Sequence, residues 1–248
     1  MNNTYFTRRT IRKYEAREID EGLLERILIA ATRASTTGNM QVYSIIVTRD
    51  PEMKKRLAPA HFNQPMATEA PVVLTFCADF NRFNKWCRQR DAEPGYDNFL
   101  SFMTAAIDAL IAAQTACSAA EEEGLGICYI GTATYNAGQI IDVLELPAGV
   151  VPVATVTMGW PAQVPEQPDR LPLEAVVHHE KYQDFTPSMI DDLYGAREAR
   201  ADSQKFIAEN GKQTLAQVFT DVRYKKADNE YFSDKFLEAI RKQGFLKS

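Results

Sequence analysis

The N-terminal stretch TRRTIRKY, residues 7–14, places four cations in eight positions. If residues 8–12 are helical, Arg8 and Arg12 lie four positions apart and their guanidiniums project from one face. Thr10 adds a hydroxyl group between them. Such a group suits a phosphate monoester, because a planar guanidinium can donate two parallel hydrogen bonds to phosphate oxygens. The alternative, from this segment alone, is a solvated basic helix start.

The rest of the chain is acidic, with a formal net charge of -5 over 248 residues. A surface that binds nucleic acid needs a dominant basic face, because most of its affinity comes from neutralised phosphates. The charge balance therefore argues against a nucleic-acid partner. It also indicates that the anion held by the N-terminal cations is small and local.

Two further segments are rich in groups that could bind a ligand. The loop RASTTGNMQVYS, residues 33–44, contains hydroxyl and amide side chains, and the segment GLGICYIG, residues 124–131, puts a glycine turn before a strand. Ordinary turn chemistry is the alternative for the loop, because Ser, Thr, Asn and Gly serve turns without any ligand. Together with the arginine pair, the two segments could hold a phosphorylated, hydrogen-bonding, partly aromatic cofactor.

Other kinds of site have no support in the sequence. It contains no zinc-type cluster, no Gly-x-Ser-x-Gly motif, and no Walker or Rossmann glycine pattern. The three histidines are not spaced for a triad or a metal site, and we interpret them as surface or structural residues: His61, His178 and His179. The cysteines form no metal-ligand pair and are expected to pack as small apolar side chains, without a role in the chemistry: Cys77, Cys87, Cys117 and Cys128.

Helices and strands alternate in the part of the chain that must position these residues. Residues 20–33 place apolar side chains on one helical stripe after a possible N-cap at Asp20. Residues 98–123 are apolar on nearly every face, which predicts a central helix or one in a subunit interface, closed by Gly124. The remaining segments are predicted as helices at 50–61 and 136–146, and as strands at 43–50, 70–79, 127–131 and 150–161.

The composition changes after Pro161, where PAQVPEQPDRLP is typical of a linker or an extended arm. The charged helices predicted near 188–202 and 230–245 have apolar stripes too narrow to fold alone, so we expect them to pack on the main body or on a second copy. We therefore divide the chain into a core, 1–160, and an arm with a helical extension, 161–248. With no signal-peptide pattern and no apolar run of about 18 residues, we expect no membrane association, a cytoplasmic location and reduced thiols.

The order and spacing of six segments resemble the FMN-dependent nitroreductase family: RRTIRKY, ASTTGNMQVYSIIV, APVVLTFCADF, EEEGLGICYIGTATYN, PVATVTMGWPA and DRLPLEAVVHHEKY. The arm segment RLPLEAVVH and the terminal RKQGF resemble the subgroup of larger, oxygen-insensitive nitroreductases and flavin reductases. The resemblance implies an α+β fold with a central, mainly antiparallel sheet flanked by helices and an extended C-terminal arm. It also implies a homodimer, with the long helix at the interface and both chains contributing to each FMN site.

At the phosphate end of FMN, the resemblance implies contacts from the N-terminal segment and from the first loop. Arg8 takes the position of a cationic contact to the phosphate, and Arg9 and Thr10 complete the contacts to phosphate and ribityl chain. Thr36, with Ser35, matches a loop hydroxyl that meets the cofactor.

At the ring end of FMN, the resemblance implies a second set of contacts. Arg12 takes the position that approaches N1 and the C2 carbonyl, and Gln64 matches an amide at the pyrimidine edge. Gly131 and Thr132 match the strand-end backbone near N5 and O4. Away from the ring, Arg170 matches a phosphate-binding cation on the arm.

The implied activity is a ping-pong reduction in which NAD(P)H reduces FMN and a nitroaromatic, a quinone or a flavin is then reduced. A fixed guanidinium beside N1 favours the reduced, anionic flavin, so no catalytic side chain is expected. The alternatives are a flavin reductase that supplies reduced FMN to a partner, and a flavin-binding protein without enzymatic activity. Pro168 replaces the usual arm lysine, and Asn210 or Lys212 stands where an arginine usually reads the NADPH 2′-phosphate. The preference between NADH and NADPH and the physiological acceptor therefore stay open.

Overall fold

The computed structural model describes residues 4–246, which group into two compact units. The first comprises Met1–Glu166 and Phe232–Ser248, and the second comprises Gln167–Tyr231. The last helix, α11 (Lys226–Lys242), passes from the second unit into the first. From the sequence we divide the chain into a core, 1–160, and an arm with a helical extension, 161–248. This division stays a prediction, because the two compact units do not show which residues hold a cofactor.

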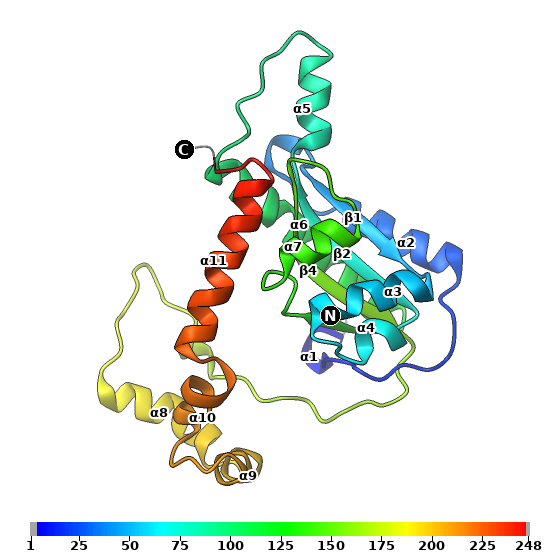
Figure 1. Ribbon diagram of the computed structural model, residues 1–248. Coiled ribbons are helices and arrows are strands. Elements are labelled where there is room, and N and C mark those ends of the chain that lie inside the picture. Colours follow the sequence, from blue (N-terminus) through cyan, green and yellow to red (C-terminus); the bar gives the residue numbers. More distant parts are fainter. Residues whose placement is uncertain (1–3, 247–248) are drawn as a thin grey trace. The chain divides into compact units, whose positions relative to one another are not determined.

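The first unit is built on a four-stranded antiparallel sheet with the order β1-β2-β4-β3 (Figure 1). The strands are β1 (Tyr43–Thr48), β2 (Val72–Asp79), β3 (Gly126–Ile130) and β4 (Val150–Gly159). Every residue of β2 is buried, because this run of apolar and β-branched residues lies between two neighbouring strands and under helices on both faces. The predicted α+β class and antiparallel sheet are confirmed.

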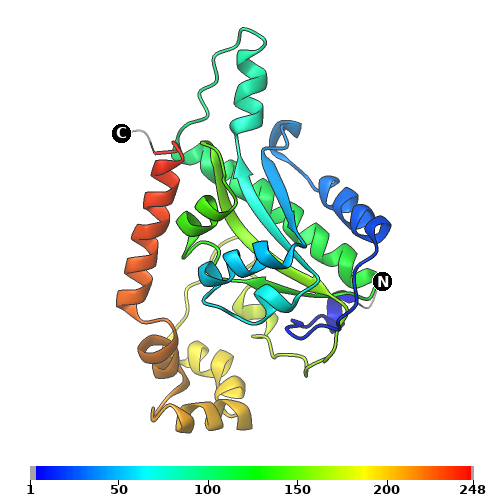
Figure 2. The same cartoon turned by 45° about the vertical axis from the view of Figure 1, so that its right-hand side comes forward.

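Helices α2 (Glu21–Thr32) and α6 (Phe99–Glu122) cover one face of the sheet (Figure 2). Each begins at a side-chain cap: Asp20 accepts from the Leu23 amide at 3.2 Å, and Asn98 accepts from the Ser101 amide at 3.0 Å. Gly124 follows α6 with φ +84°, the left-handed conformation expected of it. Both predicted helices are therefore confirmed, and together with the sheet they enclose the main core.

Helix α6 has an unusual distribution of side-chain sizes. Its buried positions are mostly alanines, which allow the helix to lie close against the sheet, while its large apolar side chains face outward: Phe99, Leu100, Met103, Ile107, Leu110 and Ile111. The expectation that no run is long and apolar enough to span a bilayer is wrong by length and composition, because α6 meets both criteria. Half of its apolar window is buried within the chain, and one helix of this kind is weak evidence for a membrane span.

Short elements cover the opposite face of the sheet, namely α3 (Pro51–Leu57), the 3₁₀ turn η2 (Ala58–His61), α4 (Met66–Glu69) and α7 (Ala137–Val143). The alternation of side chains along β3 separates the two layers. Ile127 belongs to the core under α2 and α6, whereas Cys128 and Ile130 pack with Met66 and Ala67 of α4. The helix predicted at 50–61 corresponds to α3 followed by the 3₁₀ turn η2.

Residues 8–15 form no helix and run past the outer edge of β3 and the end of β4. The Ile11 amide donates to the Ile127 carbonyl at 3.0 Å, and the Glu15 amide donates to the Trp160 carbonyl at 2.9 Å. The preceding helix α1 (Thr4–Thr7) ends before Arg8. The hypothesis that Arg8 and Arg12 share one helical face is therefore wrong, because the helix ends at Thr7 and the backbone that follows bonds to the edge of β3.

The second unit is a small helical body with an irregular segment before it. Residues 167–172 form no helix or strand, which fits the predicted arm, and a short turn η3 follows (Leu173–Ala175). Ile207, Leu215 and Val218 form its core, and Arg197 pairs with Asp169 at 2.6 Å. The helical elements of the second unit are α8 (Pro187–Glu198), α9 (Ala201–Glu209), α10 (Leu215–Val218) and the π-turn η4 (Phe219–Arg223).

Two helical elements remain in the described part of the first unit, α5 (Asn81–Arg88) and η1 (Thr37–Asn39).

The close approach of the N-terminal segment to β3 predicts a specific sensitivity at Gly126. A Cβ atom at Gly126 would lie 2.5 Å from the Ile11 Cβ, so Gly126→Ala forces the two backbones apart. We expect the free energy of unfolding in urea to fall by about 1–3 kcal/mol. Gly138→Ala in α7 is the control, because a Cβ there meets open space, and it should raise stability by up to about 1 kcal/mol. Equal effects of the two substitutions would contradict the close approach.

Candidate functional site

The turn between α3 and α4 carries the first part of the site. His61 ends η2 with 0% of its surface exposed, and Phe62 and Asn63 follow with φ of +53° each. Consecutive left-handed residues without glycine are uncommon, and here they reverse the chain before Gln64. The backbone and the side-chain amide of Gln64 both donate to the His61 carbonyl at 3.1 Å. The Gln64 amide is therefore held in place by the turn itself.

The end of β3 lies against this turn. The His61 Nδ1 atom and the Thr132 hydroxyl are 3.1 Å apart, and the Asn136 side chain donates to the Ala60 carbonyl at 2.8 Å. Gly131 is exposed, and a Cβ atom built on it would meet nothing within 4 Å. The structure thus brings together three of the predicted site residues, Gln64, Gly131 and Thr132, around an open stretch of backbone.

The N-terminal cations have different surroundings. Arg8 pairs with Glu121 of α6 at 3.0 Å; burial raises the pKa of this carboxyl, and Arg8 opposes that rise. Arg9 donates to the Pro165 carbonyl at 3.1 Å. Burial also raises the pKa of the Cys128 thiol, and the Arg12 guanidinium beside it opposes the shift. Arg12 is therefore the arginine that lies alongside β3, the strand that ends at Gly131.

The loop with the predicted Ser35 and Thr36 contacts is fixed from α6. The Thr37 amide and hydroxyl both donate to one carboxylate oxygen of Asp108, at 3.0 and 3.2 Å, and Asp108 is only 1% exposed. The Thr36 hydroxyl accepts from the Gln41 amide at 3.3 Å. A buried carboxylate thus sets the conformation of this loop.

The loop and the N-terminal cations meet α6 at distant points. Asp108 and Glu121 are 121 − 108 = 13 residues apart, which corresponds to about 20 Å along the helix at 1.5 Å per residue. Within one chain, Ser35 and Thr36 are therefore not brought together with Arg8. Arg170 belongs to the second unit, where it is exposed and donates to the carbonyl of Asp169.

Two residues that the structure places at the site, Asp108 and His61, were not assigned to it from the sequence. Asp108 carried a signal, because a lone acid in an alanine-rich, buried helix is uncommon and needs a partner. His61 carried none, because burial of its ring depends on segments 70 residues away in the chain. The structural role expected for His61 is consistent with its burial, but its bond to Thr132 adds a link to the site.

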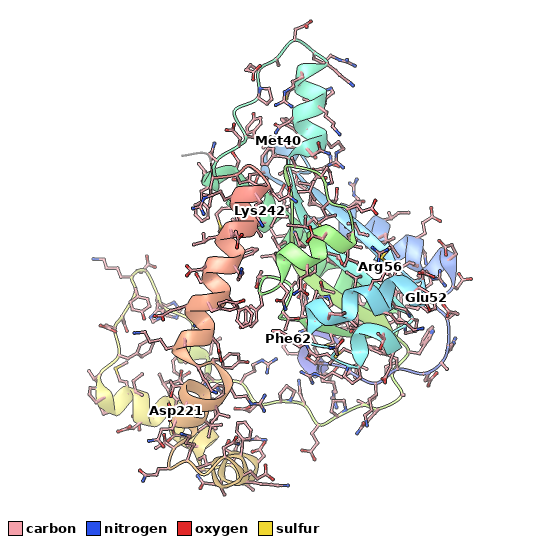
Figure 3. The ribbon with its side chains drawn as sticks, in the orientation of Figure 1. Met40, Glu52, Arg56, Phe62, Asp221 and Lys242 are labelled. Atoms are coloured by element: carbon pink, nitrogen blue, oxygen red, sulfur yellow. The ribbon has the colours of Figure 1, made fainter. Side chains whose placement is uncertain are left out.

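Aromatic rings gather beside the turn. Tyr135 stacks on Phe232 with centroids 4.6 Å apart, and Phe62 lies 5.8 Å from the same ring. Phe62 is 51% exposed and sits at the turn between α3 and α4 (Figure 3). Because Phe62 is two residues from Gln64 and Tyr135 three residues from Thr132, an aromatic flank adjoins the open backbone.

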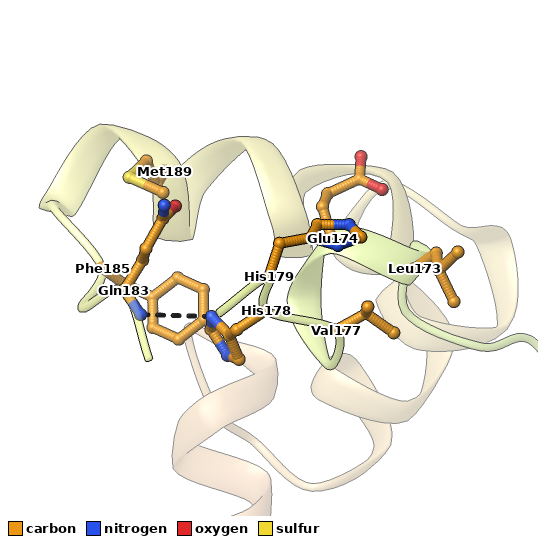
Figure 4. Close-up of a pocket in the computed structure, with 8 residues that line it drawn as sticks. All are labelled: Leu173, Glu174, Val177, His178, His179, Gln183, Phe185 and Met189. Carbon is orange, nitrogen blue, oxygen red and sulfur yellow. Dashed lines mark hydrogen bonds between the residues drawn. The ribbon is translucent and has the colours of Figure 1, made fainter. Parts of the chain in front are cut away.

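A separate hollow of about 370 Å³ lies within the second unit (Figure 4). His178 and His179 line it, and the His178 Nδ1 atom accepts from the Gln183 amide at 3.3 Å. Among residues 4–246, no group of three His, Cys, Asp or Glu side chains could hold a metal ion. Burial raises the pKa of the Cys77 and Cys117 thiols to about 12, so neither is a thiolate at neutral pH.

The sequence pattern of the nitroreductase family matches residues 5–160, more than half of the chain. The chain belongs to the nitroreductase family. This nitroreductase is 34% identical to an FMN reductase (NAD(P)H) of Bacillus subtilis strain 168, over 96% of this chain and 94% of that protein. It is 32% identical to an oxygen-insensitive NADPH nitroreductase of Salmonella typhimurium, over the same shares of the two chains.

Solved structures agree with this assignment. A candidate oxidoreductase from Bacteroides fragilis NCTC 9343 is 56% identical to the nitroreductase, with a TM-score of 0.97 over 99% of this chain and 100% of that one. The nitroreductase-like fold and the nitroreductase family, both expected from the sequence, are confirmed. The chain is an enzyme of the NAD(P)H-dependent flavin and nitro reductases.

Proposed function

We propose that this enzyme binds FMN at the end of β3 and uses it to transfer two electrons from NAD(P)H to nitroaromatics, quinones or free flavin. The observation that carries the proposal is the meeting of Gln64, Gly131 and Thr132 around open backbone, with Arg12 alongside the same strand. The relatives' names, an FMN reductase and an NADPH nitroreductase, support the reaction class.

The residues present fit FMN in their donor and acceptor types. The pyrimidine edge of a flavin offers both donors and acceptors, and a glutamine amide together with a hydroxyl and open backbone can pair with both kinds. A phosphate requires cations or hydrogen-bond donors; Arg8 and Arg9 supply cations and Thr10 supplies a hydroxyl donor. Because Arg8 is paired with Glu121, Arg9 would share the phosphate charge with it.

When bound, FMN supplies the redox chemistry, accepting a hydride and passing two electrons on. The chain's own residues orient the ring and set its electrostatics. Arg12 would favour the negative charge that develops near N1 and the C2 carbonyl on reduction. Phe62, Tyr135 and Phe232 would shield the ring from water and offer faces on which a planar acceptor stacks. No side-chain acid or base is assigned.

A homodimer is part of the proposal. The outward stripe of α6 repeats every three or four residues at Leu100, Met103, Ile107 and Leu110, which makes one continuous apolar face. Since Ser35 and Thr36 lie about 20 Å along α6 from Arg8, a partner's loop would have to bring them to the cofactor. A second copy packed on α6 meets both requirements. The cytoplasmic location stays a prediction.

The first test is cofactor loading and reduction. The purified chain should bind FMN in preference to FAD, because the cations suit a terminal phosphate, and anaerobic NADH or NADPH should bleach the yellow colour. Nitroaromatic, quinone or free FMN should then restore the oxidised spectrum. Loading with FAD alone, or no flavin after reconstitution, would overturn the proposal. Bound FMN that NAD(P)H does not bleach would instead indicate a flavin-binding protein without this activity. The rates of flavin reduction by NADH and by NADPH then give the preference between the two donors.

The second test separates the two arginines. Arg8→Ala should raise the FMN dissociation constant by about one to two orders of magnitude, because it removes one charge-assisted hydrogen bond worth about 1.5–3 kcal/mol. Arg12→Ala should lower the flavin midpoint potential by tens of millivolts, on the order expected for a similar energy in a two-electron couple. Because Arg8→Ala leaves Glu121 unpaired, the measurement is repeated in a Glu121→Gln background. If Arg8→Ala moves the potential and Arg12→Ala does not, the two roles are reversed.

The third test concerns the second copy. Ile107→Glu places a charge on the outward face of α6 and should shift light-scattering mass from dimer to monomer and weaken FMN binding. Ile29→Glu is the matched control, because Ile29 lies on α2 and is 54% exposed, against 50% for Ile107. A parent chain that is monomeric at micromolar concentration, or equal effects of the two substitutions, would refute the interface.

A further inference from the structure

We propose that His61 is a positioning residue for the flavin: its ring directs the Thr132 hydroxyl toward the cofactor as a donor, and its carbonyl fixes the Gln64 amide. This inference rests on the proposed FMN site. Its structural basis is that one buried residue contacts two of the residues placed at the cofactor, and that these two come from segments about 70 positions apart.

The bonding of the His61 ring decides its tautomer. The ring is fully buried, its Nδ1 atom lies 3.1 Å from the Thr132 oxygen, and its Nε2 atom has no hydrogen-bond partner among residues 4–246. A buried N–H without an acceptor costs more than an unused lone pair, because a neutral ring nitrogen can remain unpaired as an acceptor at lower cost. The proton therefore resides on Nδ1, which donates to Thr132.

This tautomer sets the direction of the Thr132 hydroxyl. A hydroxyl carries one donor hydrogen and two acceptor lone pairs. Because its oxygen already accepts from His61, its hydrogen is available for another acceptor, and the neighbouring Gly131 backbone is open. A flavin carbonyl or N5 at this strand end would supply that acceptor.

The ring keeps this role over a wide pH range. Burial lowers the pKa of His61 to about 4, and no charged side chain contributes to the shift. The imidazole is therefore neutral under ordinary conditions, and the direction of the hydrogen bond does not reverse. A protonated ring would carry an unpartnered N–H at Nε2 inside the protein.

The His61 carbonyl acts on Gln64 in parallel. It accepts from the Gln64 side-chain amide, so one of the two N–H groups is occupied and the side-chain orientation is defined. The Gln64 oxygen and its second N–H then remain for the two kinds of group at a pyrimidine edge. One short turn thus orders both polar contacts.

FMN binding to variants tests the link. Thr132→Val removes the hydroxyl at nearly constant shape, and His61→Leu removes the ring donor; each should raise the FMN dissociation constant about three- to tenfold, the loss of one hydrogen bond. His61→Asn, which keeps an N–H near Nδ1, and Thr132→Ser should stay within about twofold. Because His61 acts through Thr132, the double variant His61→Leu/Thr132→Val should bind as weakly as Thr132→Val alone. Additive losses, or normal binding by His61→Leu, would overturn the inference.

Nuclear magnetic resonance of the His ring nitrogens supplies a readout that does not depend on activity. With three histidines in the chain, the His61 signals can be assigned by His61→Asn. We expect a neutral ring protonated at Nδ1 down to about pH 5, with and without FMN, and loss of that preference in Thr132→Val. A ring protonated at Nε2 would overturn the inference even if FMN binds normally. A parent chain that binds no flavin would overturn the cofactor proposal and this inference with it, which the loading experiment detects separately.

Discussion

The pairing of the N-terminal segment with the outer edge of β3 is the constraint on which the site depends. It requires a residue without a side chain at Gly126, because Ile11 occupies the space where a Cβ would lie. Once this pairing forms, Arg12 lies beside β3 and Arg8 reaches Glu121. The same strand ends in open backbone at Gly131. A single register between two backbones thus places cations and open amide groups on one strand.

Local periodicity predicted the elements that carry their own signal. Helix α2 has a clear stripe and cap, and β2 is a continuous apolar run, so neither needs distant residues to be recognised. The i, i+4 spacing of Arg8 and Arg12 led to a wrong helix prediction, because a distant contact decides the conformation there. The Ile11 amide bonds to Ile127 on the edge of β3, and this contact outweighs a weak local helical preference. Periodicity also could not show which side of α6 is buried, because both sides are apolar and only packing distinguishes alanine from leucine.

The candidate site follows the same division. The order of motifs predicted the family, which is confirmed, because motif order along the chain is itself sequence information. The ten cofactor positions drawn from the same resemblance stay predictions. Their spatial grouping was beyond the sequence: Gln64 and Thr132 meet through His61, while the loop at Thr36 is held by Asp108 on the other layer. The bonds from His61 to Thr132 and from Thr37 to Asp108 each join residues 71 positions apart, and they depend on side-chain burial, which no local pattern encodes.

The size distribution along α6 has a consequence for the thermodynamics of the chain. Alanines against the sheet release little hydrophobic free energy per residue, whereas the leucines and isoleucines that could release more remain in water until something covers them. In the proposed homodimer, part of the driving force for the native state is therefore intermolecular. By mass action, the apparent melting temperature of such a chain rises with its own concentration, so dilution alone acts on it as a denaturant.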